Sequence, residues 1–130
     1  MPDSKEKGIM LMATVLAVDM QVSVKTVLYA CPAGKSFYPD HLVIRDTSAS
    51  LAGGNDYDFG TGANCDTWMQ TVDLSSMTTP GTDYKKVDPG NTKFAKCAAG
   101  SEFGIKPITG STAACTATID VFGFIKTIGG

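Results

Sequence analysis

The sequence predicts a single all-β domain, a sandwich or barrel of about eight short antiparallel strands. Its 130 residues are enough for one domain with a substantial core. Glutamate occurs only twice and Arg45 is the sole arginine, whereas Thr, Val, Ser and Gly are frequent. Exposed helix surfaces usually carry Glu, Lys, Arg and Gln, so long amphipathic helices are not expected. Gly, Pro, Asn and Asp recur about every ten residues, which is typical of turns between strands in a sandwich.

Three strands are expected in the first third of the chain. The first, Gly8–Val18, and the second, Val22–Cys31, carry apolar residues at both phases of a strand. Pro32-Ala33-Gly34-Lys35 predicts a tight turn, because proline fixes φ and glycine accepts a positive φ. The third strand, Phe37–Asp46, follows this turn.

The remaining strands are short in the middle of the chain and longer near its end. In the last of them Cys115, Ala117, Ile119 and Val121 alternate with polar residues, which indicates a half-buried antiparallel strand. No linker, repeat or change of composition divides the chain, so residues 1–130 are predicted to form one domain, with 1–7 as a flexible N-terminal segment. The expected strands are Tyr57–Phe59, Thr67–Leu74, Asp83–Val87, Thr92–Ala98, Glu102–Ile108 and Ala113–Ile125.

The clearest functional signal is for association with other protein subunits. A first strand that is apolar on both faces cannot bury both of them by packing on one side of a sandwich. Near the end of the last strand the nominally outward face becomes aromatic; the alternative is that a bulge at Gly123 or a covering loop buries both rings. Exposed apolar patches commonly mark interfaces. The predicted subunit-interface residues are Met10, Met12, Leu16, Val18, Phe122 and Phe124.

Charge and hydropathy argue against nucleic acid and membrane as partners. Charged residues make up only 18% of the chain and the net charge is −2, without a basic patch. The apolar run Gly8–Val18 is shorter than the roughly 20 residues of a transmembrane helix. Lys5 and Lys7 before this run are typical of a signal peptide, but Asp3 and Glu6 cancel their charge. We therefore interpret the run as a strand.

No catalytic group is predicted, and the chain is not expected to be an enzyme. His41 is the only histidine, so a catalytic triad would have one base, and that base lies within a strand. Ala33-Gly34-Lys35-Ser36 is similar to the tail of a phosphate-binding loop. That motif requires an earlier glycine where Tyr29 stands, and Phe37-Tyr38-Pro39 is a poor start for the helix that must follow.

Cofactors and catalytic metals are likewise not expected. Asp56 and Asp58 alternate beside a glycine as in calcium loops, but the glutamate that an EF-hand loop requires is replaced by Thr67. Asp and Asn are also ordinary turn residues, so a turn is the preferred interpretation and calcium the alternative. The four cysteines form no C-x-x-C pair. They are expected to be small buried thiols, and the sequence does not choose among disulfide pairings.

Several segments resemble the small jelly-roll proteins of phage virions. Leu28–Leu42 (LYACPAGKSFYPDHL) is similar to a hairpin with the pattern V-P-A-G-K-[ST]-F in that family, although Cys31 stands where Val or Ala is expected. Ala98–Lys106 (AAGSEFGIK) and Ala117–Phe124 (ATIDVFGF) are similar to its last two strands, with Cys115 a further departure. Ser50–Gly54 (SLAGG) and Tyr57–Gly62 (YDFGTG) add shorter matches.

This resemblance implies an antiparallel β-sandwich of jelly-roll type and a role as a virion structural protein. It implies a capsid decoration, or cement, protein that is assembled in the host cytoplasm and binds the outer capsid surface as a homotrimer, with the major capsid protein as partner. A tail-fibre or tail-tip subunit that contacts the host is the alternative within the same class. A carbohydrate-binding module is the alternative from another class, with exposed aromatic residues as its sugar platform; the candidates for that platform are Trp68, Tyr38, Tyr57 and Tyr84.

Overall fold

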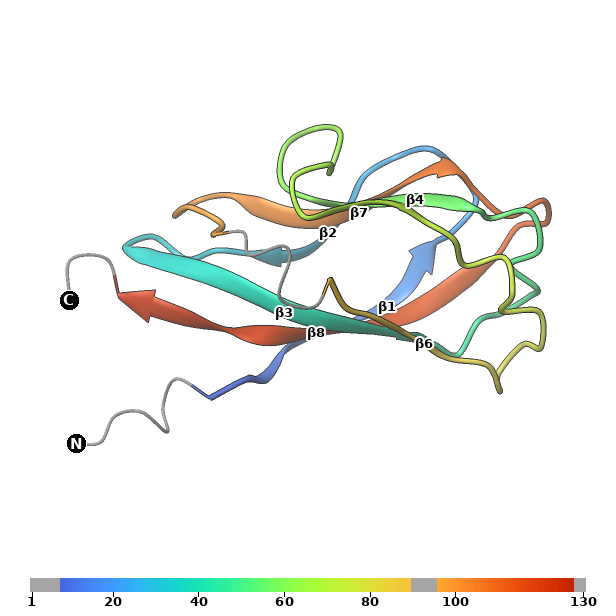
Figure 1. Ribbon diagram of the computed structural model, residues 1–130, viewed down its shortest axis with the longest axis horizontal. Helices are drawn as coiled ribbons and strands as arrows, with labels where there is room; N and C mark the ends of the chain where they lie inside the picture. The colour runs from blue at the N-terminus through green and yellow to red at the C-terminus, as the bar shows by residue number, and fades with distance from the viewer. Residues whose placement is uncertain (1–7, 90–95, 128–130) are drawn as a thin grey trace.

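The computed structural model describes residues 8–89 and 96–127, which form two four-stranded antiparallel sheets packed face to face (Figure 1). This arrangement confirms the predicted all-β sandwich with eight strands. The strands are, in chain order, β1 (Met10–Asp19), β2 (Thr26–Ala30), β3 (Lys35–Arg45), β4 (Asp56–Gly60), β5 (Met69–Val72), β6 (Lys85–Val87), β7 (Glu102–Thr109) and β8 (Thr116–Thr127).

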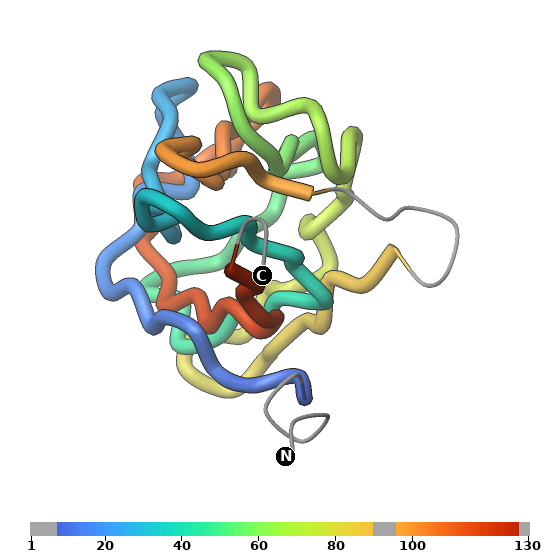
Figure 2. The backbone as a smooth tube through the Cα atoms, turned by 90° about the vertical axis from the view of Figure 1, so that its left-hand side faces the viewer, coloured from blue at the N-terminus to red at the C-terminus, as the bar shows by residue number. Residues whose placement is uncertain are grey.

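The strand pairs are nested within one another. The first sheet has the order β1-β8-β3-β6 and the second the order β2-β7-β4-β5. The first strand therefore pairs with the last, the second with the seventh, the third with the sixth and the fourth with the fifth. Strand β1 lies at one edge of the first sheet, and in Figure 2 its start, in blue, runs along the outside of the lower layer.

The sequence of β8 explains its position in the middle of the first sheet. Ala117, Ile119 and Val121 point into the core, because side chains two residues apart share a face. Thr118 and Asp120 lie on the opposite face and are also largely buried. A strand covered on both faces has to be flanked by neighbours, and β8 has β1 on one side and β3 on the other.

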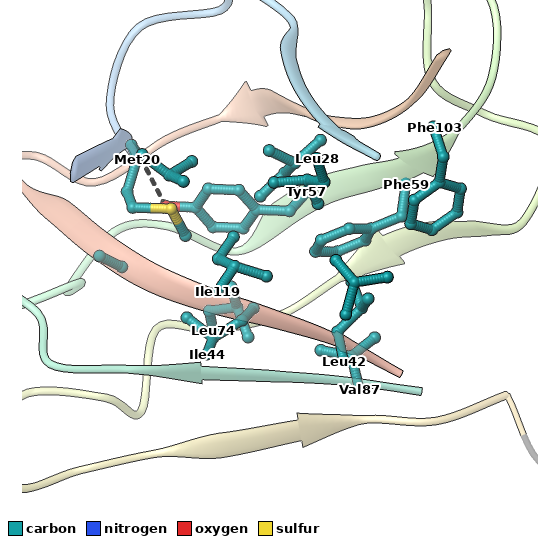
Figure 3. Packing of buried hydrophobic residues seen from close by; sticks show 14 of the residues in the cluster. Met20, Leu28, Leu42, Ile44, Tyr57, Phe59, Leu74, Val87, Phe103 and Ile119 are labelled. Atoms are coloured by element: carbon teal, nitrogen blue, oxygen red, sulfur yellow. Dashed lines mark hydrogen bonds between the residues drawn. The ribbon is translucent and has the colours of Figure 1, made fainter. Parts of the chain in front are cut away.

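The core fills the space between the two sheets (Figure 3). Trp68 is fully buried, with its ring 5.4 Å from that of Phe103 and 6.5 Å from that of Phe59, both edge to face. The buried hydroxyl of Tyr57 donates a hydrogen bond of 2.7 Å to the backbone carbonyl of Met20. The polar group of this core side chain is therefore paired.

The second strand is shorter than predicted. It begins at Thr26 rather than at Val22, because the Asp19 carboxylate accepts hydrogen bonds from the backbone N–H groups of Gln21 (2.8 Å) and Val22 (3.0 Å). These bonds turn the chain directly after β1 and keep Val22 out of a strand.

The remaining predictions are confirmed in part or lie outside the described residues. The strand predicted at Thr67–Leu74 is reduced to β5, Met69–Val72. Of the strand predicted at Thr92–Ala98, residues 92–95 are outside the described part, and Cys97 forms an isolated bridge with Phe37. The predicted flexible segment 1–7 is also outside it. Within residues 8–89 and 96–127 no helix has the length and apolarity needed to cross a membrane.

Candidate interaction face

The outer face of the first sheet carries a row of aromatic side chains. Strand β8 contributes Phe122 and Phe124, and strand β3 contributes Tyr38 and His41 directly opposite them. The register shifts between Pro39 and His41, so one extra residue is accommodated in β3 and both aromatic residues of this strand face the same side. We call these four residues the aromatic face.

The rings of the aromatic face form two parallel stacks. The ring centroids of Tyr38 and Phe124 are 4.9 Å apart with an interplanar angle of 10°, and those of His41 and Phe122 are 4.5 Å apart at 7°. Nδ1 of His41 lies 2.7 Å from Oδ2 of Asp40, which fixes the orientation of the imidazole. Each ring covers one face of its neighbour and leaves the rest of it at the surface. All four side chains are therefore half-buried. The result is a rigid surface of aromatic rings that faces outward.

The adjoining part of the same sheet face is polar but internally neutralised. The buried carboxylate of Asp120 accepts hydrogen bonds from Nε of Arg45 (2.8 Å) and from Oγ1 of Thr14 (2.8 Å). The hydrogen bond from Arg45 lowers the pKa of Asp120 from its ordinary value, against the opposing effect of burial. The buried negative charge of Asp120 is therefore paired within the sheet and needs no cation from a partner.

Edge strand β1 presents exposed aliphatic residues beside the aromatic face. Leu11 pairs in register with Phe122 and is 52% exposed, while Met10 is 49% and Leu16 is 70% exposed. We call Met10, Leu11 and Leu16 the apolar edge. No charged residue occurs between Gly8 and Val18, so the apolar edge lacks the lysines that usually protect an edge strand.

The predicted interface residues are divided between the surface and the core. Met10 and Leu16 are exposed, Phe122 and Phe124 are half-buried on the outer face, and Met12 is half-buried against the core. Val18 is 1% exposed and belongs to the core, so the prediction that it lies on an interaction surface is corrected. The register of β1 shifts between Leu11 and Ala13 and again between Val15 and Val18, and these irregularities break the alternation on which that prediction depended.

Three residues of this surface are missing from the interface predicted from sequence. Tyr38 and His41 are opposite the predicted phenylalanines, but the pairing of β3 with β8 joins distant segments and local pattern does not reveal it. Leu11 falls on the opposite phase of a regular strand from the predicted Met10, Met12 and Leu16. The aromatic content of Phe37–His41 was the signal present in the sequence.

The residues of the phosphate-loop and calcium-loop alternatives have structural roles in turns and strands. The backbone N–H of Lys35 donates to the carbonyl of Pro32 (3.2 Å) and closes the turn before β3. The ammonium group of Lys35 donates to the hydroxyl of Thr127 (3.0 Å). This segment is therefore a hairpin turn and not a phosphate-binding loop. Asp58 accepts a hydrogen bond from the backbone N–H of Thr71 (2.9 Å). Burial raises the pKa of Asp56, with a further contribution from the charge of Asp58. The described residues contain no group of three or more potential metal ligands.

The carbohydrate-binding alternative loses its main support. Trp68 and Tyr57 are both fully buried, so neither can stack on a sugar ring. Tyr38 is already stacked on Phe124, and Tyr84, although 72% exposed, lies just before β6 at the opposite edge of the sheet from β1. Of the four candidates for a sugar platform, only Tyr38 and Tyr84 therefore reach the surface.

Comparison with known proteins gives similarity in structure but no match in sequence. No family model matches the sequence, and no curated protein matches it. Among solved structures, the chain is similar to one in the acidic stable capsid structure of Helicobacter pylori bacteriophage KHP30. The two are 8% identical with a TM-score of 0.48, and the alignment covers 93% of this chain and 97% of that one. The function therefore has to be inferred from the residues of this chain.

Proposed function

We propose that this chain is a structural protein of a bacteriophage virion, a decoration protein that binds the outer surface of the capsid. The observation that carries the proposal is the apolar edge next to the aromatic face. Leu11 pairs in register with Phe122 of the aromatic face, and Met10 and Leu16 are exposed on the same edge strand. The nearby carboxylate of Asp120 is paired with Arg45. A contiguous surface of this kind is typical of a protein interface.

The strand order supports a jelly-roll assignment within the β-sandwich class. Jelly rolls consist of eight strands in two sheets formed by Greek-key connections, and they are common in viral capsid domains. The nested pairing of first with last strand, down to the fourth with the fifth, agrees with such an arrangement. The segments that resemble phage virion jelly rolls lie in β2, β3, β4, β7 and β8 and the connections next to them, which belong to both sheets.

The oligomer that we propose is a homotrimer with the major capsid protein as its partner. The resemblance to small trimeric virion proteins suggests the number of copies. The position of the apolar edge beside the aromatic face offers adjacent surfaces for two different contacts, one between copies and one with the capsid. Closed symmetry would cover the apolar edge of each copy with its neighbour.

We also propose that the chain acts by binding and has no catalytic activity. Its single histidine is stacked on Phe122 and held by Asp40, which is a structural role. The mechanical consequence of binding would be the stabilisation of the capsid, because a rigid sandwich that spans two capsid subunits adds buried area across their junction.

The direct test is addition of the purified chain to capsids assembled from the major capsid protein of the same genome without this chain. We expect binding that saturates at a fixed number of copies per capsid, measured by co-sedimentation, and capsids that resist heating to a higher temperature. Saturable binding to purified tails but not to capsids would favour the tail-fibre alternative. No binding to either assembly would contradict the virion role.

A further inference from the structure

Two buried cysteines that belong to different sheets meet at one end of the sandwich. Cys31 continues β2 in the second sheet, because its N–H donates to the carbonyl of Ser101 (2.9 Å) and its carbonyl accepts from the N–H of Gly100 (3.0 Å). Cys97 is attached to the first sheet, because it exchanges backbone hydrogen bonds of 2.9 and 2.7 Å with Phe37 in β3. In Figure 1 the β2–β3 turn and the segment leading into β7 lie at the same end of the molecule.

The side chains of these two cysteines share the same surroundings. Both are 4% exposed and belong to the same core cluster. Sγ of Cys31 lies 3.3 Å from the carbonyl oxygen of Lys35, two residues before Phe37, and a hydrogen bond from the Phe37 backbone opposes the effect of burial on its pKa. Burial and, as the smaller cause, the charge of Cys31 together raise the pKa of Cys97 to about 11. Phe37 therefore contacts both residues.

The other two cysteines lie in different places. Sγ of Cys65 is 3.8 Å from the carbonyl of Gly62, and Sγ of Cys115 is 3.3 Å from the carbonyl of Ala49. The hydrogen-bond acceptors of both thiols are backbone carbonyl oxygens, with Thr116 as a second one for Cys115. One pair of the four is thus singled out by its position.

We propose that Cys31 and Cys97 form a disulfide in oxidising surroundings and that this bond joins the two sheets at the end of the sandwich where β3 and β7 begin. The oxidant is a small-molecule disulfide such as oxidised glutathione. One cysteine thiolate attacks it, forming a mixed disulfide and releasing one glutathione thiolate; the second cysteine thiolate then displaces the other. One sulfur–sulfur bond forms and one breaks, two electrons pass from the protein to the glutathione, and the two protons end on the two released glutathione molecules.

The bond would change the stability of the whole sandwich. Without it, the segment around Cys97 is attached to the first sheet at its end through the bridge to Phe37. With it, the part of the chain from Cys31 to Cys97, which contains β3 to β6, becomes a closed loop. Closing a long loop restricts the unfolded chain more than the folded one. A virion protein that leaves a reducing cytoplasm would gain this restraint only after release.

The test uses the full chain, purified with reduced thiols and incubated with excess oxidised glutathione at about pH 8.5, where more of each thiol is ionised. We expect the loss of two hydrogen atoms by intact mass, a linkage of the Cys31 and Cys97 peptides by mapping without reduction, and a melting temperature higher by roughly 10 °C. Four free thiols after oxidation, or a linkage between any other pair, would overturn the proposal.

Matched single variants separate the bond from other effects of oxidation. Cys31→Ala and Cys97→Ala should each abolish the rise in melting temperature on oxidation. Cys115→Ala, which removes an equally buried thiol elsewhere in the core, should keep it. The comparison within each variant is between its oxidised and reduced forms, so the cost of the substitution itself cancels. A rise that persists in Cys97→Ala would contradict the assignment.

Discussion

At the scale of single residues, the ionised carboxylate of Asp120 is the best-connected polar group on the outer face of the first sheet. Arg45 and Thr14 both donate to it, and β8, β3 and β1 are thereby joined across the face. The sequence places an aspartate in a part of β8 that is buried on both faces, where a carboxylate would be costly without partners. Local pattern alone does not identify Arg45 and Thr14 as those partners, because they come from two distant strands.

Replacing Asp120 with asparagine should lower the free energy of unfolding by about 1–2 kcal/mol at pH 7, because its hydrogen bonds to charged Arg45 are weakened. The folded-state pKa of Asp120 lies below its unfolded value of about 3.9. The ionised carboxylate therefore contributes fully to the free energy of unfolding above the unfolded pKa, and this contribution is lost as the pH falls through the folded-state pKa. Thermal melts from about pH 7 to pH 2 should show the gap between wild type and variant constant above pH 5 and closing at lower pH.

The matched control is Asp46→Asn. Asp46 contacts the same arginine but is exposed, and it has a positive φ of 52° that asparagine tolerates well. This variant should melt within a few degrees of wild type at every pH, since exposed ion pairs contribute little. A gap for Asp120→Asn that is unchanged at about pH 2 would rule out the ion pair as its cause.

At the scale of secondary-structure elements, strand β1 shows where alternation predicts a surface and where it fails. The sequence identified this run as an apolar strand, and it is the edge strand of the first sheet. The second of the two register shifts, which contains Ala17 at a φ of 56°, sends Val18 into the core and leaves Leu16 exposed. Bulges of this kind depend on the partner strand, so the sequence of β1 by itself does not reveal them.

Leu16→Asp tests whether the apolar edge is an interface. The side chain is 70% exposed, so the monomer should keep its melting temperature, whereas association through this edge should weaken at least tenfold because a charge would have to be buried. Light scattering after size exclusion and co-sedimentation with capsids would measure the two contacts separately.

Tyr84→Asp is the control for that variant, since Tyr84 is 72% exposed and lies by the opposite edge of the sheet. It should leave both contacts unchanged. Equal association of wild type and Leu16→Asp would exclude the apolar edge from any interface.

The approach of β3 to β8 behind the aromatic face depends on Gly123. A Cβ at this position would lie 2.3 Å from the carbonyl oxygen of Tyr38, so the strands would have to move apart where Tyr38 stacks on Phe124. Gly123→Ala should therefore destabilise the fold by about 3 kcal/mol, measured by urea unfolding.

Gly34→Ala separates this clash from backbone strain. Gly34 has a φ of 76° in the turn before β3 but open space around it, so its replacement should cost only about 1 kcal/mol. A smaller loss for Gly123→Ala than for Gly34→Ala would contradict the close approach of the two strands.

At the scale of the whole molecule, the sequence predicts the class of the fold much better than its connectivity. Turn residues and alternation are local, so they are sufficient to predict a sandwich of about eight strands. The pairing of the first strand with the last, and of β3 with β8, joins segments from opposite ends of the chain, and many pairings bury the same residues equally well. The aromatic face arises from that pairing, so only half of it could be predicted.

The same long-range packing determines how the four thiols react. All four cysteines are buried, and burial raises the pKa of Cys31, Cys65 and Cys97, so few of these thiols are ionised at pH 7. Because the core is shared by both sheets, local fraying should not expose them, and an aromatic disulfide reagent should gain access mainly through larger opening of the sandwich. We expect at least about 100-fold slower labelling in the reduced native protein than in urea, followed spectroscopically at pH 7. Rapid native labelling of any one cysteine would show that this part of the core opens independently of the rest.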